Sequence, residues 1–179
     1  TEAQKKAAAD VGAVRMTAPG GPFGVMLRVP ELMDLAFKWR LHVAERSVIG
    51  QRLTELAILM TARQWTQQYE WNAHHPLAIK AGLKEEIVTA IAEGRRPPQM
   101  ADDEAVLYDL LTELQTTYGV TDATYARALA KFGEAGIVET TSLAGYYAML
   151  AMVMNVARTG VPEGPALPLA PLPVRALPT

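Results

Sequence analysis

Apolar residues recur through most of the chain at intervals of three and four, the spacing that places them on one face of an α-helix. The pattern is clearest in residues 30–46 and 50–65. No stretch alternates apolar and polar residues between hairpin turns, as half-buried strands do. The sequence therefore predicts an all-α protein. The aligned positions are Leu32, Leu35, Ala36, Trp39 and Val43 in the first segment, and Leu53, Leu56, Leu59, Met60 and Arg63 in the second.

Helix-forming segments fill most of the remaining chain. Thr121 is a plausible N-cap, and glycines that favour helix ends stand at Gly82, Gly94 and Gly119. Pro76 lies inside one predicted helix, where it removes a backbone hydrogen bond, so we expect that helix to kink or open there. The further predicted helices cover residues 1–13, 64–82, 83–94, 101–119, 120–136 and 137–160.

Two segments interrupt this helical pattern. Residues 17–24, TAPGGPFG, contain helix-breaking Pro and Gly. They lack the Lys-Ser or Lys-Thr of a phosphate loop, so we expect a flexible flank, with a place over a pocket as one use. Residues 161–179 hold half of the twelve prolines and predict an extended tail on its own domain or a neighbouring subunit. Residues 1–160 then form one helical domain.

Composition narrows the function classes. A chain of 179 residues that is 50% hydrophobic can bury the core of one domain. The net charge of -2 gives no electrostatic reason to expect nucleic acid, and no apolar run reaches the roughly 20 residues that span a bilayer. We therefore expect a soluble protein without nucleic-acid or membrane partners. The chain begins at Thr1, as a processed form would, which leaves cytoplasm and periplasm both open.

Candidate chemistry gathers in residues 64–82, QWTQQYEWNAHHPLAIKAG. Residues four apart share a helix face, so Glu70 and His74 are expected neighbours, with Gln67 one turn earlier. Trp71 and His75 form a second stripe, because adjacent residues point about 100 degrees apart. We therefore do not expect His74 and His75 to bind the same atom. A solvated polar face or a hydrogen-bonded core histidine would explain the same spacing.

Residues 55–83, ELAILMTARQWTQQYEWNAHHPLAIKAGL, resemble the signature region of the carboxymuconolactone decarboxylase family, which includes the AhpD-type alkylhydroperoxidases. The peroxidase branch carries a glutamate, eleven residues, Cys-x-x-Cys, three residues and a histidine. Glu55 and His74 match this spacing, while Gln67 and Glu70 stand at the two cysteine positions. Because the chain has no cysteine, dithiol peroxide reduction is disfavoured. The resemblance is closer to the cysteine-free branch and implies an all-helical homotrimer or homohexamer.

The resemblance implies a cofactor-free lyase that acts by proton transfer on a small carboxylated or lactone substrate. Histidine suits an acid/base role because an unperturbed imidazole exchanges protons near neutrality, and we assign this role to His74. We expect Glu70 to fix the tautomer of His74, and Glu55 to be a second proton carrier if burial raises its pKa. The predicted catalytic residues are His74, Glu70 and Glu55, and the predicted substrate-binding residues are Gln67, Trp71 and Arg63, each of which also has a structural explanation.

Two other function classes remain open. Glu70 and His74 are spaced so that they could hold a metal ion with Glu55 as a third ligand, although the usual pair of histidines four apart is missing. A non-catalytic helical oligomer that binds a small molecule would keep the apolar helix faces and tolerate replacement of all three residues. We favour the enzyme that uses no metal or organic cofactor, with a small molecule as its substrate.

Overall fold

Helices form the regular structure of the part of the chain that the computed structural model describes, residues 1–15, 20–161 and 169–170. No strand occurs in these residues, which confirms the prediction of an all-α protein. The helices are α1 (Glu2–Arg15), α2 (Pro22–Met26), α3 (Pro30–Val43), α4 (Gln51–Gln64), α5 (Gln68–Lys80), α6 (Glu85–Ala92), α7 (Asp102–Thr117) and α8 (Asp122–Ala157).

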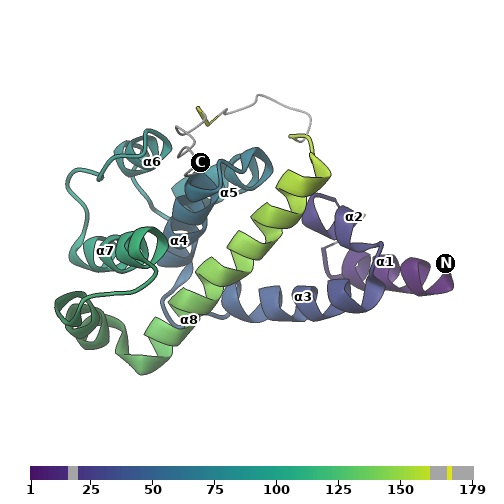
Figure 1. Cartoon of the computed structure of the whole chain (residues 1–179), viewed down its shortest axis with the longest axis horizontal. Helices are drawn as coiled ribbons and strands as arrows, with labels where there is room; N and C mark the ends of the chain where they lie inside the picture. Colours follow the sequence, from purple (N-terminus) through teal and green to yellow (C-terminus); the bar gives the residue numbers. More distant parts are fainter. Residues whose placement is uncertain (16–19, 162–168, 171–179) are drawn as a thin grey trace, which may run out of the picture.

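The long helix α8 organises the fold. It crosses the molecule diagonally in Figure 1, with α1, α2 and α3 on one side and α4 to α7 on the other. It packs against α2 and α3 from the first group and against α4 and α7 from the second. By length and composition alone α8 could cross a membrane, and 44% of its apolar window is buried within the protein.

The structure corrects the predicted boundaries around α8 and α2. Residues 120–136 and 137–160 were expected as two helices, yet one helix runs from Asp122 to Ala157, with a kink at Gly133 (φ 66°, ψ 177°). Thr121 caps it as predicted, because its hydroxyl accepts from the Thr124 backbone amide. Part of the expected loop 17–24 instead enters α2, where Pro22 takes a first-turn position that needs no amide donor.

The predicted core face of α3 is wrong in part. Leu32, Leu35 and Trp39 are 46%, 58% and 42% exposed, whereas Met33 and Phe37 are buried. Both sets recur at helical spacing on different sides of the helix, so the pattern alone cannot select between them. Packing against α1, α2 and α8 selects the second set.

α4 is the most enclosed helix of the domain. Every residue from Leu53 to Arg63 is buried, including the charged Glu55. Its neighbours α5, α6, α7 and α8 surround it, which accounts for burial beyond the single predicted face.

Most of the predicted Pro-rich tail, residues 161–179, lies outside the described residues. Leu169 and Ala170 are described, and the Leu169 side chain is buried. The Gln68 side chain donates to the Leu169 carbonyl and accepts from the Leu169 amide, each at 2.9 Å. These two bonds fix this piece of the tail to the start of α5.

Candidate functional site

The turn between α4 and α5 is built around Gln67. Its side-chain oxygen accepts hydrogen bonds from the backbone amides of Tyr69 (2.6 Å) and Glu70 (3.1 Å), which caps α5. Its side-chain nitrogen donates to Asn155 on α8 at 3.0 Å. Both ends of the Gln67 amide are therefore engaged in holding α5 between α4 and α8, and Gln67 is absent from the lining of the pocket next to it.

His74 is held by a carboxylate from the neighbouring helix. Its Nδ1 lies 2.8 Å from Oε2 of Glu55, and Gln51 donates to the other Glu55 oxygen at 2.8 Å. Glu55 is only 2% exposed. A hydrogen bond at Nδ1 fixes the orientation of the imidazole and leaves Nε2 for chemistry. The expectation that Glu70 fixes the His74 tautomer is corrected, because Glu55 makes this contact across the α4–α5 interface.

Glu70 is buried without a hydrogen-bond partner. The residue is 3% exposed, and neither carboxylate oxygen has a partner among the described residues. Burial raises the pKa of Glu70 well above its ordinary value, because a lone carboxylate is poorly stabilised away from water. A raised pKa favours the protonated form of this buried carboxyl group.

Glu70 and His74 face one pocket of about 200 Å³ between α2, α3, α5 and α8. We call it the acid pocket. Glu55 stands behind His74 and does not line it. The acid pocket is lined by Pro22, Phe23, Arg40, Tyr69, Glu70, Ala73, His74, Leu77, Tyr147 and Leu150. The segment expected as a flank over a pocket thus contributes Pro22 and Phe23.

Arg40 and Tyr147 are pocket residues that the sequence did not indicate. Arg40 comes from α3 and forms an ion pair with Glu45 at 2.5 Å, while its side chain stays 24% exposed. Tyr147 comes from α8 and packs its ring edge-on against the His74 imidazole, with centroids 5.1 Å apart. Burial raises the pKa of Tyr147 well above its ordinary value, so its phenol remains a hydrogen donor.

Tyr147 and Arg40 differ in whether the sequence carries a signal that could have identified them. A tyrosine inside an apolar helix carries a hydroxyl that must find a polar partner when buried, so Tyr147 had a signal in the run GYYAML. The sequence carries no signal for Arg40, because Lys38 and Arg46 have the same charge and lie on the same segment. Only the packing of α3 against α8 distinguishes it.

Arg63 and Trp71 are not brought to the acid pocket. Arg63 donates to the backbone carbonyls of Ala92 (3.3 Å) and Ala170 (2.8 Å) and to the Thr66 hydroxyl (2.9 Å). It therefore ties the end of α4 to the end of α6 and to the described part of the tail. Trp71 is buried, with its ring 6.0 Å from that of His75.

The remaining histidines lie apart from the acid pocket. His75 is 3.3 Å from Glu85 at the start of α6, and His42 is 3.0 Å from Glu139 on α8. In the part of the chain that the structure describes, no group of three or more His, Cys, Asp or Glu side chains could hold a metal ion. Glu55, Glu70 and His74 therefore do not form the three-ligand set that the metal alternative requires.

Comparisons with known proteins bear on the fold. No family model matches the chain, and no curated protein matches it by sequence. A crystal structure of a protein of unknown function from Agrobacterium tumefaciens, described as a putative antioxidant defence protein AhpD, is similar with a TM-score of 0.69. The two chains are 17% identical, and the match covers 78% of this chain and 96% of the other. This protein therefore has the AhpD-like all-α fold.

Proposed function

We propose that the protein is a cofactor-free acid/base enzyme of the carboxymuconolactone decarboxylase type, acting on a small carboxylated or lactone substrate. One observation carries the proposal: a buried, unpartnered Glu70 and an oriented His74 line the same pocket. Pairs of titratable groups in contrasting environments mark acid/base sites. The Glu55, Gln67, Glu70 and His74 spacing supports the family assignment, and the AhpD-like fold agrees with it.

His74 is the proposed acid/base at the reacting carbon. Glu55 holds Nδ1, so Nε2 is the ring nitrogen that exchanges a proton with the substrate. In a decarboxylation the bond to the carboxylate breaks, carbon dioxide leaves, and the electron pair moves into the adjacent unsaturated system. A proton delivered to carbon then completes the reaction, and the imidazolium of His74 can supply it.

Glu70 provides a second proton. Because burial raises its pKa and so favours its protonated form, Glu70 can donate a hydrogen bond to the substrate oxygen on which negative charge develops. Tyr147 is a second neutral donor at the same pocket. Neutral donors suit this task, since they stabilise developing charge without repelling an anionic substrate.

Arg40 takes the place we had expected for Arg63 as the anchor of an acidic substrate. It is the one Arg or Lys among the described lining residues of the acid pocket. Its ion pair with Glu45 occupies one guanidinium nitrogen, and the planar group has further donors for a carboxylate. A substrate that carries at least one carboxylate beside its reacting centre fits this arrangement.

The decisive experiment is a substrate screen. Lactones, β-keto acids and related small acids are incubated with the protein, and carbon dioxide release and solvent-proton exchange are measured. We expect His74→Ala to lower turnover on the order of 100-fold. His75→Ala is the matched control, because that ring pairs with Glu85 outside the pocket. Equal turnover in wild type and His74→Ala would remove His74 from the mechanism and favour the non-catalytic binding protein.

Assembly into a homotrimer or homohexamer is part of the proposal. Val29, the residue that precedes α3, forms an exposed stripe with Leu32 and Leu35 on α3, and we expect another copy to bind on this stripe. Sedimentation would give the mass of wild type and of Leu35→Glu. A smaller assembly in the variant supports the stripe as the contact, and an unchanged mass places the contact elsewhere.

A further inference from the structure

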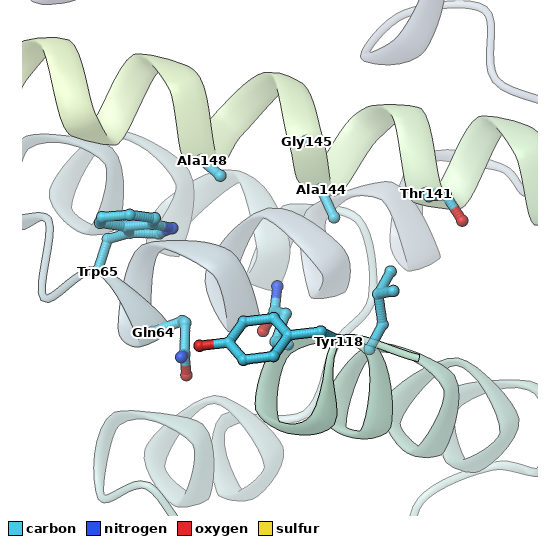
Figure 2. Close-up of a pocket in the computed structure, with 9 residues that line it drawn as sticks. Gln64, Trp65, Tyr118, Thr141, Ala144, Gly145 and Ala148 are labelled. Atoms are coloured by element: carbon cyan, nitrogen blue, oxygen red, sulfur yellow. The ribbon is translucent and has the colours of Figure 1, made fainter. Parts of the chain in front are cut away.

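A second and larger pocket lies between the ends of α4 and α7 and the middle of α8 (Figure 2). Its volume is about 450 Å³, within the range of small-molecule sites. It shares no lining residue with the acid pocket. We call it the aromatic pocket, after Trp65 and Tyr118 in its lining.

The two aromatic side chains stand at helix ends. Trp65 ends α4 and is 38% exposed, and Tyr118 ends α7 and is 88% exposed. Tyr118 has left-handed backbone angles (φ 62°, ψ 20°), a conformation that normally favours glycine. Glycine does occur in this turn, but one residue later, at Gly119. The chain thus keeps a large exposed ring at a backbone position that disfavours it.

The wall formed by α8 is lined with small residues. Ala144 and Ala148 extend from the helix toward the pocket in Figure 2, with Gly145 between them. A Cβ atom added to Gly145 would meet no described atom within 4 Å, whereas one added to Gly136 would lie 2.6 Å from Cβ of Phe132. Close packing therefore accounts for Gly136 but not for Gly145. Glycine weakens a helix interior relative to alanine. Because packing does not require glycine at position 145, we attribute Gly145 to the open pocket beside it.

The polar groups of the aromatic pocket are uncharged. The described lining residues include no Asp, Glu, Lys, Arg or His, and the polar side chains are Gln64, Gln115 and Thr141 besides the two rings. Gln115 donates from its side-chain nitrogen to the Thr61 hydroxyl at 3.1 Å, which leaves its carbonyl oxygen to accept. Burying a charge here would leave that charge unpaired. The lining therefore selects against charged ligands.

We propose that the aromatic pocket binds an uncharged, flat, largely apolar small molecule that carries a hydrogen-bond donor. The ring faces of Trp65 and Tyr118 supply stacking surface. The small residues of α8 supply a flat wall, and Gln115 accepts from the donor. The site is separate from the acid pocket and does not depend on the proposed lyase activity.

The test uses N-phenyl-1-naphthylamine, an uncharged aromatic amine whose fluorescence rises in apolar surroundings. The probe is titrated into wild type, Gly145→Leu and Ala130→Leu. Gly145→Leu fills the pocket from a position where a side chain has room, and we expect it to weaken probe binding at least about tenfold. Ala130→Leu is the matched control, an exposed position on α8 outside the pocket lining, and it should bind as wild type does.

A second variant, Tyr118→Gly, removes one ring at a position whose backbone angles glycine accepts. It should also weaken probe binding, with unfolding curves confirming that the variants are folded. Equal binding by wild type and both pocket variants would overturn the proposal, as would the absence of probe binding to wild type. A change in sedimentation mass in Gly145→Leu with probe binding unaltered would instead show that a second copy of the chain covers this surface, which also overturns it.

Discussion

The acid pocket and the aromatic pocket lie in the same helical domain and differ in the charge and burial of their polar side chains. The acid pocket buries Glu70 without a hydrogen-bond partner and places His74 beside it, fixed by Glu55. The aromatic pocket has only uncharged polar groups and leaves the Tyr118 ring largely exposed. The first arrangement shifts a pKa, as proton transfer requires. The second offers stacking surface, as binding requires.

The difference also shows where each pocket departs from ordinary protein structure. In the acid pocket the departure is electrostatic, because an ionisable group is kept from water. In the aromatic pocket it is conformational, because Tyr118 holds a left-handed backbone and Gly145 weakens a helix. Replacing Glu70 should therefore change how the free energy of unfolding depends on pH. Replacing Tyr118 or Gly145 should change the free energy of unfolding itself.

The largest effect is expected from Glu70→Gln on turnover. The variant keeps the size of the side chain but loses the proton that the acid donates, so turnover on a substrate found in the screen should fall by about 100-fold. Glu85→Gln is the matched control, because Glu85 is exposed and pairs with His75 away from the pocket. Steady-state rates at neutral pH measure the effect. Equal rates in wild type and Glu70→Gln would leave Glu70 without a catalytic role.

The same substitution should change how stability depends on pH. In the unfolded chain Glu70 ionises near its ordinary value of 4.5, whereas in the folded protein its pKa lies well above this. As pH rises through the window between the two values, the unfolded state loses the proton first, so the wild type loses stability relative to Glu70→Gln. The slope approaches about 1.4 kcal/mol per pH unit and becomes flat above the folded pKa.

Urea unfolding of wild type and Glu70→Gln from pH 4 to pH 8 measures this difference. Below the unfolded pKa the difference between the two free energies of unfolding should be constant, and it should widen in favour of the variant as pH rises. Parallel curves across the whole range would show that Glu70 titrates normally in the folded protein.

Tyr118→Gly should stabilise the fold while it weakens ligand binding. Relief of the left-handed backbone is expected to raise the free energy of unfolding by about 1 kcal/mol, since the exposed ring contributes little packing. Gln99→Gly, at another left-handed position (φ 49°), is the control that should gain stability without affecting probe binding. Denaturant unfolding checks the first effect. A loss of stability in Tyr118→Gly would mean that the ring supports the fold.

The smallest effect is expected from Gly145→Ala. Alanine in a helix interior is favoured over glycine by roughly 0.5–1 kcal/mol, and its methyl group has open space here. Gly136→Ala provides the contrast, because its Cβ would clash with Phe132 and the variant should lose stability. Thermal unfolding of the two variants measures both changes. Destabilisation by Gly145→Ala would reveal a packing role for this glycine.

The sequence by itself determined the all-α class and the spacing of the candidate site residues along the chain. Helical spacing depends only on neighbours along the chain, so the helices were predicted, although Gly133 kinks α8 without ending it. The resemblance of residues 55–83 to a family signature singled out Glu55 together with His74, and the structure joins them by a hydrogen bond. These features need no knowledge of how the helices pack.

Only the tertiary structure decided which carboxylate orients His74 and which is left alone. Glu70 is the nearer in sequence, but the rotation of α4 against α5 brings Glu55 to the imidazole. The packing of the helices likewise places Arg40 and Tyr147 in the acid pocket and leaves Leu35 exposed on α3. Contacts between helices depend on the rotation and crossing of whole elements, which the spacing within one helix does not fix.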